Sequence, residues 1–136
     1  MEKQGGAPEV RVVEAWHEAL NDGEVDRLVG LSHPDVEVGG PRGTRRGARL
    51  LREWVDRANV RLAPRRLFAH GDIVVVEQAG RWRSAESGEA IASQTVASVL
   101  GVSDGLVTSV VRYDDLSEAL TRVSLDHSDE IRPENR

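Results

Sequence analysis

The sequence predicts an α+β domain in which helices cover one face of a curved antiparallel sheet. Apolar residues recur at helical spacing up to about residue 58, and beyond Pro64 the period changes to two and β-branched residues become dense. Helices followed by a run of strands are typical of α+β architecture. The 136 residues suffice for one domain with one core. Long twisted strands that wrap a helix form a cone, and a cone of this size tends to enclose a pocket.

Three helices are expected before the main strands. The first, at about residues 9–21, carries apolar side chains on one side and ends at Gly23. A short second helix from residue 25 must end before Pro34, because the residue before a proline resists helical geometry. A brief strand at residues 36–38 and a glycine-rich loop lead to the third helix, at about residues 47–58.

Four antiparallel strands are expected next, at residues 65–69, 73–83, 90–102 and 106–113. Turn residues separate them, as hairpins require. Asp115 and Glu118 have capping-box spacing and predict a last short helix. The predicted domain therefore spans residues 9–123. Residues 1–8 and 124–136 contain few apolar side chains, and we expect flexible tails there.

The composition excludes several classes of function. A net charge of −5 disfavours a nucleic-acid partner, and no apolar run is long enough to predict a membrane partner. The chain has no cysteine, which excludes disulfides, thiolate nucleophiles and cysteine-ligated metals. Its four histidines have no metal-ligand spacing, so no metal is expected. The first residues lack the apolar region of a signal peptide, and a cytoplasmic location is expected.

A basic segment interrupts this acidic background. Nine arginines lie between Arg42 and Arg66, opposed there only by Glu53 and Asp56. They form either a solvated surface or a rim that attracts anions. Few aromatic residues accompany them, so they do not predict a surface on which nucleic-acid bases would stack.

Three segments carry a family resemblance: residues 16–28, residues 33–38, and residues 104–116, which begin Asp-Gly-Leu-Val and end Tyr-Asp-Asp-Leu. Together they resemble the NTF2-like superfamily, and within it the SnoaL-like branch. The resemblance covers about residues 9–123 and implies a cystatin-like cone with an internal pocket. It also implies relatives such as ketosteroid isomerases, epoxide hydrolases and polyketide cyclases. Because one fold hosts many reactions, the pocket residues must decide between these activities.

Two catalytic sets of these relatives are not retained at the matching positions. The tyrosine of the ketosteroid isomerases matches Trp16, and their two aspartates match residues 38–40 and 95–97, where no carboxylate occurs. The five catalytic positions of the epoxide hydrolases fall on Val38, Gly40, Gln78, Gly80 and Arg112. Proton abstraction needs a base within hydrogen-bond reach, so neither mechanism is supported.

The same alignment predicts a mostly apolar pocket wall on the inward face of the strands. Arg112 on this face must pair or meet an anion, since an unpaired buried charge is costly. Asp114 is its candidate internal partner, and a ligand anion is the alternative. The predicted ligand-binding residues are Trp16, Val76, Gln78, Trp82, Gln94, Val96, Ser98, Val110 and Arg112.

Three functions stay open at this point. The first is a pocket protein that binds a small, largely apolar molecule, anionic if Arg112 binds it. The second is a cofactor-independent isomerase, cyclase or hydrolase of a cyclic or polyketide-like substrate. In that case Asp114 and His17 are the candidate acid or base, and Arg112 stabilises negative charge. The third is a dimeric interaction module without a ligand. No cofactor is expected in any of them.

A homodimer is expected through the outer face of the sheet. That face would present a partly apolar surface, too extensive to leave in water. Its predicted members are Val75, Ala79, Thr95, Ala97, Val99, Val107, Ser109 and Val111.

Overall fold

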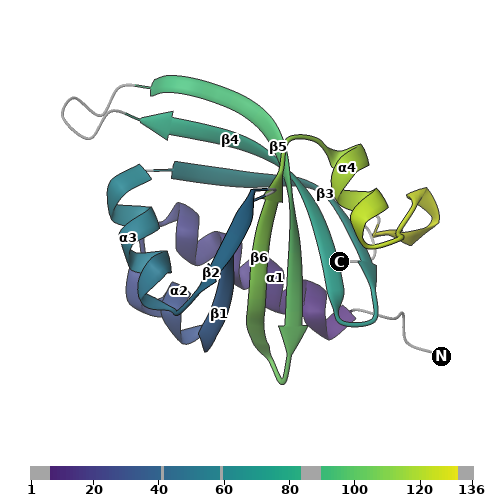
Figure 1. The fold of residues 1–136 in the computed structure, drawn as a ribbon, viewed down its shortest axis with the longest axis horizontal. Coiled ribbons are helices and arrows are strands. Elements are labelled where there is room, and N and C mark those ends of the chain that lie inside the picture. Colours follow the sequence, from purple (N-terminus) through teal and green to yellow (C-terminus); the bar gives the residue numbers. More distant parts are fainter. Residues whose placement is uncertain (1–6, 41, 59, 84–89, 132–136) are drawn as a thin grey trace.

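Helices lie against a strongly curved sheet in the computed structural model (Figure 1), which confirms the predicted α+β cone. The structure describes residues 7–40, 42–58, 60–83 and 90–131. The helices are α1 (Ala7–Asn21), α2 (Val25–Gly30), α3 (Arg49–Ala58) and α4 (Leu116–Arg122), with a 3-10 turn, η1 (His127–Asp129). The strands are β1 (Ser32–Gly40), β2 (Gly43–Arg46), β3 (Val60–His70), β4 (Ile73–Arg83), β5 (Ala90–Ser103), β6 (Leu106–Tyr113) and β7 (Glu130–Ile131). None of the helices described is long and apolar enough to cross a membrane.

The seven described strands form one sheet in the order β2-β1-β6-β5-β4-β3-β7. Strand β1 runs parallel to β6, whereas we expected only antiparallel neighbours. The reason is that α3 and four strands separate β1 from β6, so the chain returns by a crossover rather than a hairpin. Residues 43–46, expected in a loop, form β2, which pairs with the end of β1.

The main core lies between α1 and the inner face of the sheet. Val13, Trp16 and Leu20 recur at helical spacing and are fully buried there. Val74 and Val76 of β4 face them, as the alternation along the strand requires. The inner face predicted for β4 is therefore the one that packs against α1.

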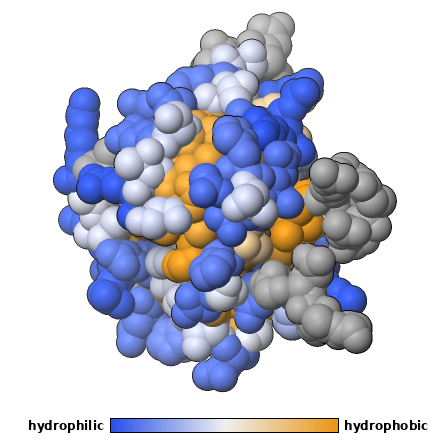
Figure 2. Space-filling view, turned by 90° about the vertical axis from the view of Figure 1, so that its right-hand side faces the viewer, coloured by the Kyte–Doolittle hydropathy of each residue, from blue (hydrophilic) through white to orange (hydrophobic). Residues whose placement is uncertain are grey.

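Helix α4 covers part of the outer face. Val75, Ala97 and Val99, which we expected on the dimer surface, are buried in a second core that includes Ala119 and Leu120. Their placement on an exposed surface was wrong because the last helix folds over them. The right-hand side of Figure 1, where α4 lies, still shows apolar surface between hydrophilic residues in Figure 2.

Val107 was also wrongly placed on the outer face. Gly101 pairs with Ser109 while Val102 pairs with Val107, so Thr108 is an extra residue in β6. This bulge turns the Val107 side chain into the main core. The strip left for the expected dimer consists of Ala79, Thr95, Ser109 and Val111, all half-buried or exposed. The dimer itself stays a prediction.

The chain after α4 folds back onto β3. Residues 127–131, which we expected in a flexible tail, form η1 and β7, and β7 pairs with Leu67 and Phe68. The Arg66 guanidinium donates from Nε and from a terminal nitrogen to the Glu130 carboxylate, both at 2.9 Å. Backbone pairing and this ion pair order a segment whose sparse apolar content predicted mobility. Residues 132–136 lie outside the described part of the chain.

Asn21 fastens the end of α1 to the start of β3. Its side-chain Nδ2 donates to the carbonyl of Leu62 at 2.9 Å, and its Oδ1 accepts from the Leu62 amide at 2.8 Å. The Asn21 side-chain amide thus pairs with the backbone N–H and C=O of Leu62 as a neighbouring strand would. The chain then turns at Gly23, whose φ of +71° is easily adopted only without a side chain.

Replacing Asn21 with Ala should therefore lower the free energy of unfolding by about 2 kcal/mol, because both backbone groups of Leu62 lose their partner. Urea unfolding of the variant and wild type would measure the difference. The neighbouring exchange Asp22→Ala, at an exposed position, should change stability by less than about 0.5 kcal/mol. Equal effects at both positions would contradict the role of Asn21.

Candidate functional site

Polar side chains are buried at one place in the main core. Within the described residues, His17, Ser32, Gln78 and Ser98 are the polar side chains that are almost completely buried. His17 comes from α1, Gln78 from β4 and Ser98 from β5. These three are joined by hydrogen bonds, and we call them the buried network.

The directions of the hydrogen bonds follow from the chemistry of each atom. His17 Nδ1 lies 2.8 Å from the carbonyl oxygen of Val13, which can only accept, so Nδ1 carries the proton. His17 Nε2, 2.7 Å from Gln78 Nε2, then accepts from the Gln78 amide. The Ser98 hydroxyl donates to Gln78 Oε1 at 2.9 Å. No buried side-chain nitrogen or oxygen among the described residues lacks a partner.

Burial keeps His17 neutral. Loss of hydration lowers the pKa of the fully buried imidazole to about 4, and the hydrogen bond to Val13 opposes this only in part. The indole of Trp16 meets the imidazole edge-on, with ring centroids 5.3 Å apart. Val76 and Val96 belong to the same core. The buried network is therefore an uncharged polar cluster within an apolar wall.

Trp16 is fixed by a second set of hydrogen bonds. Its Nε1 donates to the Ser32 hydroxyl at 3.1 Å, and that hydroxyl donates to the carbonyl of Leu28 at 2.9 Å. The indole is thus tied to the junction of α2 and β1. Ser32 was not singled out from the sequence, where it is one serine among many with no neighbouring motif.

The structure separates the other predicted site residues into two groups. Val76, Val96 and Val110 are buried in the main core with Trp16. Gln94 is exposed, opposite Gly80. The side chain of Trp82 lies outside the described part of the structure.

Arg112 and Asp114 are both exposed. The internal pair that we considered is wrong, because the structure shows no ion pair between these two described side chains. Arg112 lies directly opposite Ser98 in the sheet, so both side chains point to the inner face. Arg112 is therefore a cation next to the buried network that reaches water, whereas Asp114 is not brought to that network by any described hydrogen bond.

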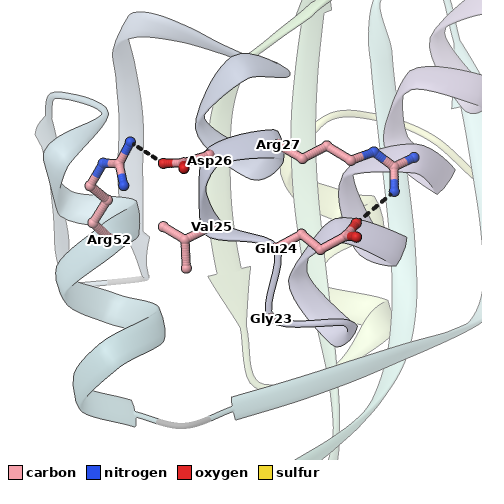
Figure 3. A pocket seen from close by; sticks show the side chains of 6 residues that line it. All are labelled: Gly23, Glu24, Val25, Asp26, Arg27 and Arg52. Atoms are coloured by element: carbon pink, nitrogen blue, oxygen red, sulfur yellow. Dashed lines mark hydrogen bonds and ion pairs between the residues drawn. The ribbon is translucent and has the colours of Figure 1, made fainter.

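An open groove of about 590 Å³ lies between α2 and α3 (Figure 3). Its charged side chains are paired: Arg52 with Asp26 at 2.8 Å, and Arg27 with Glu24 at 3.0 Å. Paired, exposed charges leave this groove without a group that would select a ligand. No cluster of His, Asp and Glu that could hold a metal ion occurs in the described ranges.

A family model of the SnoaL-like domain matches residues 13–110. Among curated protein sequences, none matches the chain significantly. An LEH-like epoxide hydrolase from M. tuberculosis is 22% identical, with a TM-score of 0.70, over 88% of this chain and 87% of that one. TerC, co-crystallised with polyporic acid, is 24% identical, with a TM-score of 0.68, over 85% and 97% of the two chains. A candidate polyketide cyclase from Xanthomonas campestris pv. campestris is 23% identical, with a TM-score of 0.64, over 85% and 96%.

These comparisons confirm the resemblance that the three sequence segments predicted. The identities are all below 25%, so the solved structures establish a shared fold and no shared reaction.

Acid should destabilise the fold through His17. Its pKa of about 4 in the folded chain lies below the value of about 6.5 expected after unfolding, so the unfolded chain binds the proton more tightly. This contribution to stability is complete above about pH 6.5 and is lost as the pH falls toward 4. Over that range, the free energy of unfolding of the wild type should fall by up to about 3 kcal/mol more than that of His17→Gln.

Urea unfolding at a series of pH values would measure both curves. The exchange His33→Gln, at an exposed position, should give the same pH dependence of the free energy of unfolding as the wild type. Parallel curves for wild type and His17→Gln would show that His17 is not held neutral by burial.

Proposed function

The chain belongs to the SnoaL-like domain family and has the NTF2-like fold, and on this premise we propose that it binds a small, largely apolar molecule inside the cone. The buried network of His17, Gln78 and Ser98 would supply the polar contacts, and Trp16 and the valines of the inner face the apolar ones. Binding pockets of this kind combine apolar walls with a few placed polar groups.

The buried network is the observation that carries this proposal. A core that served packing alone would be more simply built with apolar residues at positions 78 and 98, as at Val76 and Val96 beside them. Burying an amide and a hydroxyl costs free energy that their mutual hydrogen bonds only offset. A polar contact with a bound molecule would explain why Gln78 and Ser98 are polar, which packing alone does not.

The similar solved structures support the class of ligand. They include a candidate polyketide cyclase, an epoxide hydrolase and a protein crystallised with polyporic acid. A cyclic or polyketide-like compound is therefore the first ligand class to test. Arg112, exposed on the same face as Ser98, suits a compound that carries an acidic group.

Catalysis is the second candidate function, favoured by the neutral imidazole of His17. At pH 7 its Nε2 carries a lone pair, which accepts from Gln78 in the structure and is the basic site of the buried network. Asp114, the other candidate acid or base, is exposed to solvent and is less suited to a water-excluded step. The reaction class would be a cofactor-independent isomerisation, cyclisation or hydrolysis.

Replacing Gln78 with Leu should weaken ligand binding about tenfold, which corresponds to about 1.4 kcal/mol for one lost polar contact. Polyporic acid and 1-naphthoate are suitable probes, because both combine apolar rings with an acidic group. Titration of the ¹⁵N-labelled protein by NMR would give the affinity and would show whether the signals of His17, Gln78 and Ser98 shift.

Thr95→Val provides the matched control, since Thr95 is an exposed residue of β5 expected on the outer face. Its affinity should equal that of the wild type. Signals that shift only along the outer groove formed by Leu116, Leu120 and Leu125 would contradict binding inside the cone.

A further inference from the structure

The polar side chains of the inner face continue from the buried network to the surface. Gln78, Ser98 and Arg112 lie on three successive strands, and Ser98 is hydrogen-bonded to the first and directly opposite the last. Together with His17 they form one line, which we call the polar line. It runs from a fully buried imidazole to an exposed guanidinium across a face of β4, β5 and β6 whose other buried side chains are apolar.

In the structure, the hydrogen bonds of the polar line all point inward. The Ser98 hydroxyl donates to Gln78, and Gln78 donates to His17. Ser98 therefore presents only lone pairs to a molecule beside it. An N–H or O–H group of a ligand fits these lone pairs, whereas an oxyanion would place acceptor against acceptor.

The same atoms also allow the opposite direction. If His17 gains a proton on Nε2, that nitrogen becomes a donor, and the Gln78 amide must rotate by half a turn so that Oε1 accepts from it. The Gln78 NH₂ group then donates to Ser98, and the Ser98 proton is free to point toward the ligand. His17 Nδ1 keeps its bond to Val13 in both arrangements, so no buried group loses its partner.

We propose that the polar line is a two-state site for a ligand oxyanion, such as a carboxylate or an enolate, held between the Ser98 hydroxyl and the Arg112 guanidinium. Binding of the oxyanion takes up one proton from solvent onto His17 and reverses the hydrogen bonds of the line. This inference rests on the proposed function, because it specifies the polar group that the bound molecule presents.

Among the described groups around His17, none is a charge that would hold the imidazole in one state. Helix α1 presents the Val13 carbonyl, β4 presents Gln78, and β5 adds Ser98 behind it. The causes of the lowered pKa of His17 are burial and the Val13 hydrogen bond, with no ion pair among them. The negative charge of a bound ligand can therefore determine whether His17 is protonated, and with it the direction of the hydrogen bonds in the polar line.

Proton uptake tests the inference directly. We would measure binding of 1-naphthoate and of neutral 1-naphthamide by calorimetry, in buffers of different ionisation enthalpy, between about pH 6 and pH 8, where the carboxylate stays ionised. Naphthoate should bind with uptake approaching one proton, and its affinity should fall with rising pH, by up to about tenfold per pH unit. Naphthamide should bind without proton uptake, because its NH₂ group donates to the Ser98 lone pairs.

Two serines of β5 give matched variants. Ser98→Ala should abolish the proton uptake that accompanies naphthoate binding, and Ser93→Ala, at an exposed position, should retain it. Naphthoate binding without proton uptake in the wild type would overturn the two-state site and leave the proposed function standing. Uptake that persists in Ser98→Ala would do the same. Failure of both compounds to bind would overturn the proposed function and the two-state site together.

The wild-type imidazole provides a second measurement that does not depend on any variant folding. The ¹⁵N signals of His17 should show a protonated Nδ1 and an unprotonated Nε2 in the free protein. With naphthoate bound, both nitrogens should be protonated. An Nε2 that stays unprotonated in the naphthoate complex would overturn the inference.

Discussion

The side-chain amide of Gln78 joins helix α1 to strand β5 inside a core that excludes water. Its oxygen and its nitrogen each need a partner, and Ser98 and His17 are the two that the fold provides. Because side chains alternate along a strand, a slip of β4 by one residue would move Gln78 to the outer face and leave His17 Nε2 without a partner. The register of β4 and the position of α1 are thus linked by the same two hydrogen bonds, while the Val13 carbonyl fixes the tautomer of His17.

Much of the fold could be predicted because each element carries its own local signal. Alternation located β4 and β6, and the spacing of Asp115 and Glu118 predicted α4, where Asp115 indeed accepts from the Glu118 amide at 2.8 Å. Strand β2 escaped prediction because Gly-Thr-Arg-Arg has no apolar alternation, and its residues are all exposed. The bulge at Thr108 and the return of the chain to β3 depend on partners distant in sequence, which no local pattern encodes.

The candidate site shows the same division. Gln78 and Ser98 could be assigned to the inner face from alternation together with the family alignment, and His17 was notable only as the neighbour of Trp16. Their contact could not be predicted, because it depends on where a helix lies over a sheet and on a diagonal pairing between strands. Arg112 was placed on the correct face, but its pairing with Asp114 was wrong, since near the end of β6 both side chains reach water and need no internal partner.

A buried network that is fully satisfied and uncharged stabilises the folded chain, yet it offers little to a reaction. Every side-chain nitrogen and oxygen of the network already has a hydrogen-bond partner, and neither catalytic set retains a carboxylate at the matching positions. Uniform contacts with an apolar wall bind substrate and transition state about equally, so they accelerate little. Any chemistry at this place must therefore come from a group whose state changes when a ligand arrives. Within the described core, His17 is the buried residue with a titratable side chain, and the surrounding dry wall strengthens the effect of any change in its charge.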